Sequence, residues 1–235
     1  MPDREITFGG VEIPAHVAST PHIIRGVRKM QVTPIAGTNR EVVEMEDAWE
    51  NYDQPYSFYL GDGSEDSIQE KLCAVADIVS KKGYQILIDD YEPDIYRLAY
   101  YKEGLDTASK YTRLGTFKLV FRCRAERYLR YGNDPRAVQT GDTIKNPTAY
   151  TAAPLIHITG TGNGTITIGS KTMTITGMTD YLNIDSEKQD VYRLPAENKN
   201  NLASGEFPML YSGNNTVTFT GGIATVTITP RFYVI

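Results

Sequence analysis

The second half of the chain, from Pro154 to Ile235, is dominated by runs in which apolar residues alternate with threonine. The runs are 165–168, 172–176, 216–220 and 225–229. A period of two places successive side chains on opposite faces of an extended strand, and threonine favours strands because it is β-branched. The pattern therefore predicts antiparallel strands with an apolar inner face and a threonine-rich outer face.

Glycines separate these runs. Gly169-Ser170-Lys171 and Gly221-Gly222 lie between neighbouring runs, and a glycine-rich segment, 160–164, precedes the first. Glycine adopts positive φ readily, so we expect hairpin turns at 169–171 and 221–222 and a turn at 160–164. In the preceding segment, 155–159, the isoleucines should point inward and His157 outward.

The first half contains one segment with helical periodicity, residues 67–83. Ser67 and Glu70 form a capping box at its start, and Gly83 is placed to cap its end. Its apolar stripe consists of Ile68, Leu72, Val75, Ile78 and Val79. We expect this amphipathic helix to lie on a sheet, because the segments 84–88, 96–101 and 114–124 have strand patterns.

Tyr131–Pro135 interrupts the strand pattern with residues that favour turns. We therefore predict a mainly β chain with two domains. Residues 1–135 should form an α+β domain, β-sandwich-like with one α-helix. Residues 136–235 should form an antiparallel β-sandwich.

The net charge of −5 lies entirely in residues 1–135, because residues 136–235 hold equal numbers of acidic and basic side chains. Neither part has the basic excess that nucleic-acid binding requires. No apolar stretch approaches the length of a membrane span, and no signal peptide is evident, so we expect folding in a cytoplasm. The 2 cysteines, Cys73 and Cys123, are too few for a disulfide framework and are expected to be buried thiols.

Residues that support chemistry are scattered. The 3 histidines, His16, His22 and His157, lie far apart in sequence, and no serine lies in a nucleophile elbow. The acidic segment 89–94 has carboxylates suited to calcium, but it lacks the spacing of an EF-hand loop and favours a solvated turn. A carboxylate pair for glycoside hydrolysis has as candidates Asp180, Asp185, Glu187 and Asp190. Solvated acids would look the same. We predict no catalytic, cofactor-binding or metal-binding residues, no cofactor and no enzymatic activity.

Aromatic residues leave two alternatives open. The cluster that begins at Trp49 and ends at Tyr59 is either core or a protein contact. Tyr181, Tyr192 and Tyr211 could offer a stacking face to a sugar, but the galactose-binding motif of galectins is absent. Asn146-Pro147 lacks the flanking His and Arg of that motif.

Several segments together resemble the distal tail proteins of siphophages. In the second half they are YLNIDSEKQDVYR (181–193), NLASGEFPMLYSGNNTVTFTG (201–221) and VTITPRFYVI (226–235). In the first half they are the capped helix, LIDDYEPDIY (87–96) and 115–123. The segment 37–41 departs from the arginine- and glycine-rich pattern of the family. The resemblance covers most of the chain.

The resemblance implies a structural role. Distal tail proteins form hexameric rings that join the tail tube to the tail tip, with a ring-forming first domain (the belt) and a galectin-like second domain. It implies as partners further copies of the chain, the tail tube protein, a tail-associated tip protein and receptor-binding proteins. It places the protein at the virion tail tip, in the short form of the family. A carbohydrate-binding module of a phage tail is the alternative.

Overall fold

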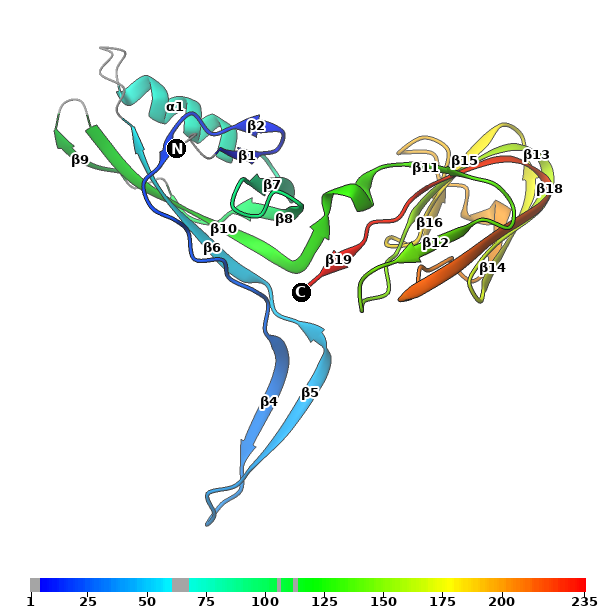
Figure 1. The fold of residues 1–235 in the computed structure, drawn as a ribbon, viewed down its shortest axis with the longest axis horizontal. Coiled ribbons are helices and arrows are strands. Elements are labelled where there is room, and N and C mark those ends of the chain that lie inside the picture. The colour runs from blue at the N-terminus through cyan, green and yellow to red at the C-terminus, as the bar shows by residue number, and fades with distance from the viewer. Residues whose placement is uncertain (1–4, 61–67, 105–106, 112–113) are drawn as a thin grey trace. The chain divides into compact units, whose positions relative to one another are not determined.

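The computed structural model describes residues 5–60, 68–104, 107–111 and 114–235. Strands predominate in this part of the chain, and its one α-helix is α1 (Ile68–Val79) (Figure 1). The predicted fold class, mainly β with one helix, is confirmed. The chain divides into two compact units, residues 1–127 with Ile235 and residues 128–234. Each unit is described separately.

The first unit is built on a 9-stranded sheet in the order β2-β1-β7-β8-β10-β6-β3, with β9 and β19 also pairing with β10. Its strands are β1 (Ile6–Phe8), β2 (Val11–Glu12), β3 (His16–Val17), β6 (Tyr52–Leu60), β7 (Gln85–Asp89), β8 (Ile95–Tyr101), β9 (Thr107–Tyr111) and β10 (Leu114–Leu129). The pairing of β7 with β8 and the long strand β10 agree with the strands expected there.

Alternate residues of β6 and β10 form the core of this unit. Phe117, Leu119, Phe121 and Cys123 point into it, as their spacing predicts. α1 covers the same face: Val75 and Val79 are buried against it, and the rest of the apolar stripe is partly buried. A single amphipathic helix thus completes the core that one sheet face begins.

The ends of α1 differ from the prediction. Ser67 of the capping box lies outside the described residues. The helix ends at Val79, where the Ser80 amide donates to the Ala76 carbonyl, so Gly83 is not its cap. Gly83 lies beyond it with φ +73 and turns the chain toward β7. Cys73 is exposed on α1 and only Cys123 is buried, so the expectation of two buried thiols was wrong for Cys73.

Residues 28–49 form a two-stranded hairpin that the sequence did not predict. β4 (Arg28–Pro34) pairs with β5 (Glu41–Trp49) in a sheet separate from the main one. Figure 1 shows this hairpin extending away from the rest of the first unit. Met30 lies exposed on this hairpin.

The second unit is built on an 8-stranded sheet in the order β11-β18-β13-β14-β17, with β12, β15 and β16 paired off this path. Its strands are β11 (Arg136–Val138), β12 (Thr143–Asn146), β13 (Leu155–Ile168), β14 (Lys171–Met178), β15 (Tyr181–Asp185), β16 (Asp190–Tyr192), β17 (Ala203–Gly205) and β18 (Gly213–Thr229). The short 3-10 turns η1 (Arg130–Asn133) and η2 (Asn200–Leu202) connect them. The strand β19 (Tyr233–Val234) is the one that pairs with β10.

Two long strands, β13 and β18, run side by side and bend together. The first part of β13 pairs with β15 and with the end of β18, and its last part pairs with β14 and with the start of β18. The register shifts between Thr159 and Gly164, at the glycine-rich segment. Each strand therefore contributes to two sections of sheet, and the apolar faces of these sections share one core.

This arrangement corrects part of the turn assignment. Gly169-Ser170 does form the hairpin turn between β13 and β14. The segments 160–164 and 221–222 are not hairpin turns but bends inside β13 and β18. A Cβ atom on Gly222 would lie 1.7 Å from the Thr161 carbonyl oxygen, and one on Gly160 would lie 2.0 Å from the Gly222 carbonyl oxygen. The glycines allow two backbones to touch, which turn propensity alone does not reveal.

Candidate interaction surface and polar clusters

The hairpin β4–β5 has one apolar face and one mixed face. Met30 pairs with Met45 and Val32 pairs with Val43 on one face. Gln31 with Glu44, and Thr33 with Val42, alternate with these pairs and so lie on the other. We call the first set, Met30, Val32, Val43 and Met45, the apolar hairpin face.

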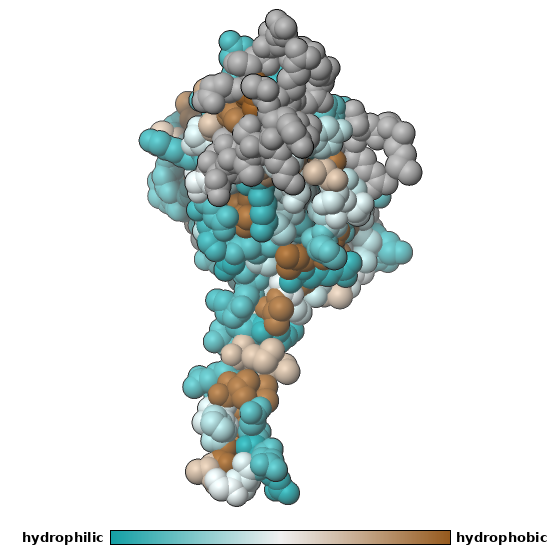
Figure 2. Space-filling model, turned by 90° about the vertical axis from the view of Figure 1, so that its left-hand side faces the viewer, coloured by the Kyte–Doolittle hydropathy of each residue, from teal (hydrophilic) through white to brown (hydrophobic). Residues whose placement is uncertain are grey.

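This face is open to solvent in the isolated chain. Met45 is 66% exposed, and Met30, Val32 and Val43 are each between 44% and 48% exposed. Figure 2 shows apolar side chains along the length of the hairpin. An isolated two-stranded hairpin is marginally stable in water, and contiguous exposed apolar side chains on a soluble protein mark interaction sites.

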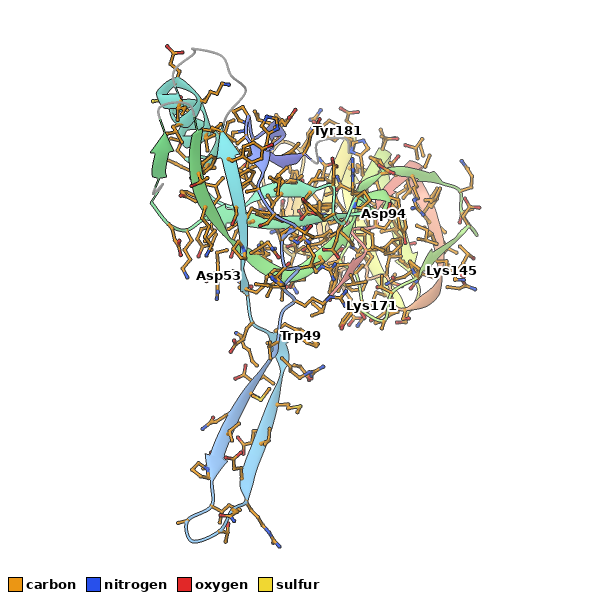
Figure 3. All side chains as sticks on the ribbon, turned by 60° about the vertical axis from the view of Figure 1, so that its left-hand side comes forward. Trp49, Asp53, Asp94, Lys145, Lys171 and Tyr181 are labelled. Atoms are coloured by element: carbon orange, nitrogen blue, oxygen red, sulfur yellow. The ribbon has the colours of Figure 1, made fainter. Side chains whose placement is uncertain are left out.

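The base of the hairpin is held by Arg28 and Trp49, which lie opposite each other in the ladder. The Arg28 guanidinium lies 5.0 Å from the Trp49 ring centroid and also pairs with Asp47. Figure 3 places Trp49 where the hairpin meets the main sheet, and Asp53 in the next strand, β6. Of the predicted aromatic cluster, Tyr52, Tyr56 and Phe58 are core, whereas Trp49 is part of this junction.

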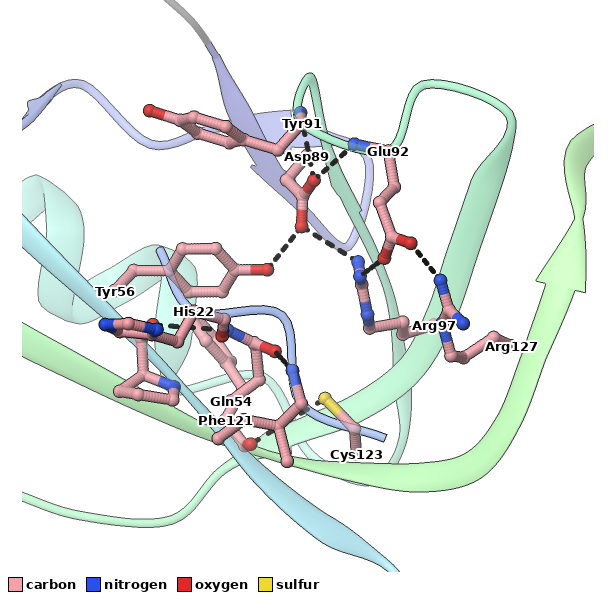
Figure 4. Close-up of polar contacts among 12 residues, drawn as sticks. His22, Gln54, Tyr56, Asp89, Tyr91, Glu92, Arg97, Phe121, Cys123 and Arg127 are labelled. Atoms are coloured by element: carbon pink, nitrogen blue, oxygen red, sulfur yellow. Dashed lines mark hydrogen bonds and ion pairs between the residues drawn. The ribbon is translucent and has the colours of Figure 1, made fainter. Parts of the chain in front are cut away.

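The acidic segment that begins at Asp89 is a turn that is solvated only in part, because Asp90 and Asp94 are exposed whereas Asp89 is buried. Asp89 is fully buried and accepts hydrogen bonds from the Tyr56 hydroxyl at 2.5 Å and from Arg97 at 2.8 Å (Figure 4). Its other oxygen accepts the backbone N–H groups of Tyr91 and Glu92. The carboxylate oxygens of Asp89 are therefore occupied by hydrogen bonds that fix the β7–β8 turn and tie it to Tyr56.

A second carboxylate of this segment, that of Glu92, is bound by two arginines. Glu92 pairs with both Arg97 and Arg127. Arg97 is completely buried, which is tolerable for a guanidinium only when carboxylates surround it. Burial raises the pKa of Tyr56 well above its ordinary value, partly offset by Arg97, so this hydroxyl stays a donor to Asp89. The sequence missed this cluster because its partners, in β6, β8 and β10, are far apart along the chain.

Arginines on the outer face of β10 have partners within the chain. Arg122 and Lys102 both pair with Asp53, at 3.0 and 2.8 Å. The hydrogen bond from Lys102 lowers the pKa of Asp53. Arg124 lies over the Tyr84 ring at 4.8 Å.

The histidines do not come together with a nucleophile. His16 stacks on Tyr59, with ring centroids 5.1 Å apart. The His22 carbonyl accepts a hydrogen bond from the Gln54 side chain. His157 lies on the outer side of β13, as expected, where its Nδ1 is 2.9 Å from the Asn183 amide oxygen.

The acids considered for glycoside hydrolysis are paired within the chain, and Glu187 shares Arg231 with Asp185. Asp180 pairs with Arg193 at 2.8 Å, and Asp190 accepts a hydrogen bond from Asn198 at 2.8 Å. Glu187 lies 3.5 Å from Arg231.

Asp185 is the most deeply placed of these acids. Its side chain is 1% exposed and is bound by both terminal nitrogens of Arg231, at 2.7 and 3.3 Å. It also accepts the backbone N–H groups of Glu187 and Lys188. Burial alone would raise the pKa of Asp185, but the hydrogen bond and charge of Arg231 outweigh burial and lower it. Two segments of the family resemblance, 181–193 and 226–235, are thus joined by one ion pair.

The tyrosines considered for sugar stacking do not form a free platform. The Tyr181 ring packs between Arg193, at 5.2 Å, and the ring of His157, at 5.4 Å. Tyr192 lies on the neighbouring strand, whereas Tyr211 lies beside Gly169 at the β13–β14 turn. Asn146 is buried and donates to the Tyr150 and Leu210 carbonyls.

In the ranges given above, no group of His, Cys, Asp and Glu side chains is arranged to hold a metal ion. Within the same ranges, no helix is long and apolar enough to cross a membrane.

No protein-family model and no curated protein sequence matches the chain. Solved structures do match. SPP1 Dit (gp 19.1), described as a paradigm of the hub adsorption apparatus in phages that infect Gram-positive bacteria, superposes with a TM-score of 0.72 over 99% of each chain at 12% identity. A chain of the phage P2 baseplate in its activated conformation matches with TM-scores of 0.57 with calcium and 0.56 with strontium. Both matches cover 96% of this chain and 97% of the other, at 11% identity. The protein therefore has the fold of phage hub and baseplate proteins, the class that its sequence resemblance predicted.

Proposed function

We propose that this protein is a structural subunit of a phage tail, a distal tail hub at the tail tip that connects the tail tube to the tip. The observation that carries the proposal is the fold match to SPP1 Dit over 99% of both chains. The commitment of the acids and arginines to internal ion pairs supports a role in assembly rather than catalysis.

Assembly in this proposal is a closed ring of six copies. A ring repeats one head-to-tail interface by rotation, so each copy needs two different surfaces. The apolar hairpin face supplies one of them, because it is exposed in the single chain and its hairpin has few contacts of its own. Residues 1–135 then form the ring, and the galectin-like domain, 136–235, faces outward. The tail tube protein, the tip protein and receptor-binding proteins are the further partners.

Neighbouring valines on opposite faces of β5 provide a matched test. Val43 belongs to the apolar hairpin face and is 48% exposed, whereas Val42 lies on the other face and is 46% exposed. Lysine at either position replaces a valine of similar exposure in the same strand, so we expect a similar effect on the hairpin alone. Burying an ammonium in an interface, by contrast, costs several kcal/mol, so only Val43→Lys should disrupt a ring that buries this face.

The measurement is the mass of the assembly, by light scattering over a range of concentrations, with rings viewed by negative-stain electron microscopy. We expect hexamers for the wild type and for Val42→Lys, and monomers for Val43→Lys at the same concentration. A wild type that stays monomeric at every concentration would contradict the ring. Intact rings with Val43→Lys would contradict the role of this face.

A further inference from the structure

The main sheet of the first unit has a second face, opposite the one that α1 covers. In β7 and β8, Leu87 and Ala99 point into the core under α1. The residues that alternate with them therefore point to the opposite face. They are Tyr84, just before β7, Ile86 and Ile88 of β7, and Leu98 and Tyr100 of β8. We call these residues the outer sheet patch.

The members of the outer sheet patch lie side by side. Ile86 is the ladder partner of Leu98 across β7 and β8. The Tyr84 and Tyr100 rings meet edge to face, with centroids 5.3 Å apart. Tyr84 and Ile86 are 38% exposed and Tyr100 is 37% exposed, whereas Ile88 and Leu98 are half-buried. Contiguous exposed apolar side chains on a soluble protein mark interaction sites.

The exposed large hydrophobic residues of the described chain gather in two places. One group falls between residues 24 and 45, in the hairpin β4–β5 and the segment that leads into it, and the other is the outer sheet patch. The remaining ones belong to separate segments: Val11, Tyr131, Leu194 and Tyr211. Among the residues that the structure describes, the patch is therefore the apolar surface that matches the hairpin in kind and lies outside it.

The apolar hairpin face has acidic ends. Residues two apart along β5 share a face, so Glu41 and Asp47 lie on the same side as Val43 and Met45, one beyond each end. The Asp47 side chain stays fully exposed although it pairs with Arg28 at 3.2 Å. The hairpin therefore presents an apolar strip between two carboxylates.

The outer sheet patch has a basic edge. Arg122 and Arg124 lie on the outer side of β10, the neighbour of β8 in the sheet order. The Arg124 guanidinium lies 4.8 Å from the Tyr84 ring centroid. Asp53 offsets only one of the charges here, because it pairs with both Arg122 and Lys102. The two apolar surfaces thus carry opposite charges at their margins, which favours contact between them and disfavours contact between two surfaces of the same kind.

We propose that the outer sheet patch of one copy binds the apolar hairpin face of the next copy. This inference rests on the proposed ring, which needs two different surfaces on each chain and in which the hairpin supplies only one. The hairpin of the same chain extends away from the main sheet (Figure 1), so the occupant comes from another copy. Methionine and valine side chains pack well on tyrosine rings, because methionine sulfur is attracted to aromatic edges and the rings offer a large apolar area.

Cross-linking between copies tests the contact. Val43→Cys, on the hairpin, and Ile86→Cys, on the patch, are each made in a full-length Cys73→Ser chain, because Cys73 is exposed whereas Cys123 is buried. The two variants are mixed when dilute, concentrated to allow assembly and treated with a short bis-maleimide reagent. We expect a product that joins one chain of each variant, identified by mass spectrometry of the linked peptides.

Val42→Cys is the matched control for the hairpin position, since its exposure is similar but it lies on the other face. Mixed with Ile86→Cys, it should give about tenfold less cross-linked product, because its side chain points away from the contact.

A second measurement needs no cysteine. Ile86→Lys should break the ring from the side of the patch, as Val43→Lys does from the side of the hairpin. Val11→Lys, at a similarly exposed position outside the patch, should leave hexamers. A one-to-one mixture of Val43→Lys and Ile86→Lys retains one intact surface of each kind, so it should form mixed dimers that cannot grow further. Light scattering measures these masses at a concentration at which the wild type is hexameric.

The outcomes separate this contact from the ring itself. Wild-type hexamers together with intact rings of Ile86→Lys, or with equal cross-linking by Val42→Cys and Val43→Cys, would overturn the contact and leave the ring standing. Lysine variants that stay monomeric when mixed would overturn the pairing of the patch with the hairpin. A wild type that remains monomeric at every concentration would overturn the ring and the contact together.

Discussion

At the scale of single residues, the side chains that suggest chemistry in the sequence are bound to one another in the structure. Asp89, Glu92, Arg97 and Arg127 form one buried cluster, and Asp185 with Arg231 form a second pair. Removing one partner of such a pair leaves a buried charge without compensation, which costs more than the pair itself contributes. These residues should therefore be sensitive to substitution in stability measurements.

Asp185→Asn should destabilise the protein by about 3 kcal/mol at pH 7, because Arg231 loses its carboxylate. The folded-state pKa of Asp185 is lowered, so its stabilisation is complete above the unfolded-state value, about 4, and is lost as pH falls through the folded-state value. The difference between wild type and variant should shrink below pH 4. Urea unfolding followed by circular dichroism at several pH values measures it.

Asp190→Asn is the matched control, since Asp190 contacts an amide and no arginine. It should change stability by less than about 1 kcal/mol at every pH. Equal effects of the two variants would mean that the Arg231 pair contributes little.

At the scale of elements, the spacing of apolar residues made many of the strands and the helix predictable. The buried positions of β10 and α1 follow from their spacing, and the threonine runs of the second unit are strands with isoleucine inside, such as Ile166, Ile168 and Ile175. Local pattern could not show where a strand ends. Gly221-Gly222 looks like a turn in sequence, but only the approach of β13 to β18 shows that it is a bend in one strand.

The hairpin β4–β5 was unpredictable for a related reason. Its valines and methionines favour strands, but the alternation of residues does not show which strand pairs with which, or whether the side chains are covered by the same chain or by another.

Gly222→Ala should destabilise the second unit by more than about 4 kcal/mol, because the new Cβ would lie 1.7 Å from the Thr161 carbonyl oxygen. Gly177→Ala should cost only about 1 kcal/mol, since Gly177 has φ +70 but open space around it. Thermal unfolding of the purified variants compares the two. Similar melting temperatures would mean that the bend tolerates a side chain.

At the scale of the whole molecule, assembly through the apolar hairpin face should make the hairpin more ordered at protein concentrations at which the ring forms. Arg40 lies exposed beside the start of β5, in the chain that joins the two hairpin strands. Binding that involves the folded hairpin stabilises it by mass action, so the tip should be cleaved readily in dilute protein and resist cleavage in the ring.

An arginine-specific protease should therefore cut after Arg40 at least about tenfold faster in dilute monomer than in assembled protein. Mass spectrometry of the fragments identifies the cut, and protein diluted just before digestion provides the monomer. Equal rates in both samples would show that the hairpin is no more ordered in the assembly.

The shared course of β13 and β18 gives the second unit a mechanical property. Both backbones continue from one sheet section into the other, and they stay hydrogen-bonded to each other on both sides of the bend. The two sections therefore cannot separate without breaking the pairing of β13 with β18. A tensile load on either section passes through two covalent chains, so the sandwich must yield all at once or not at all.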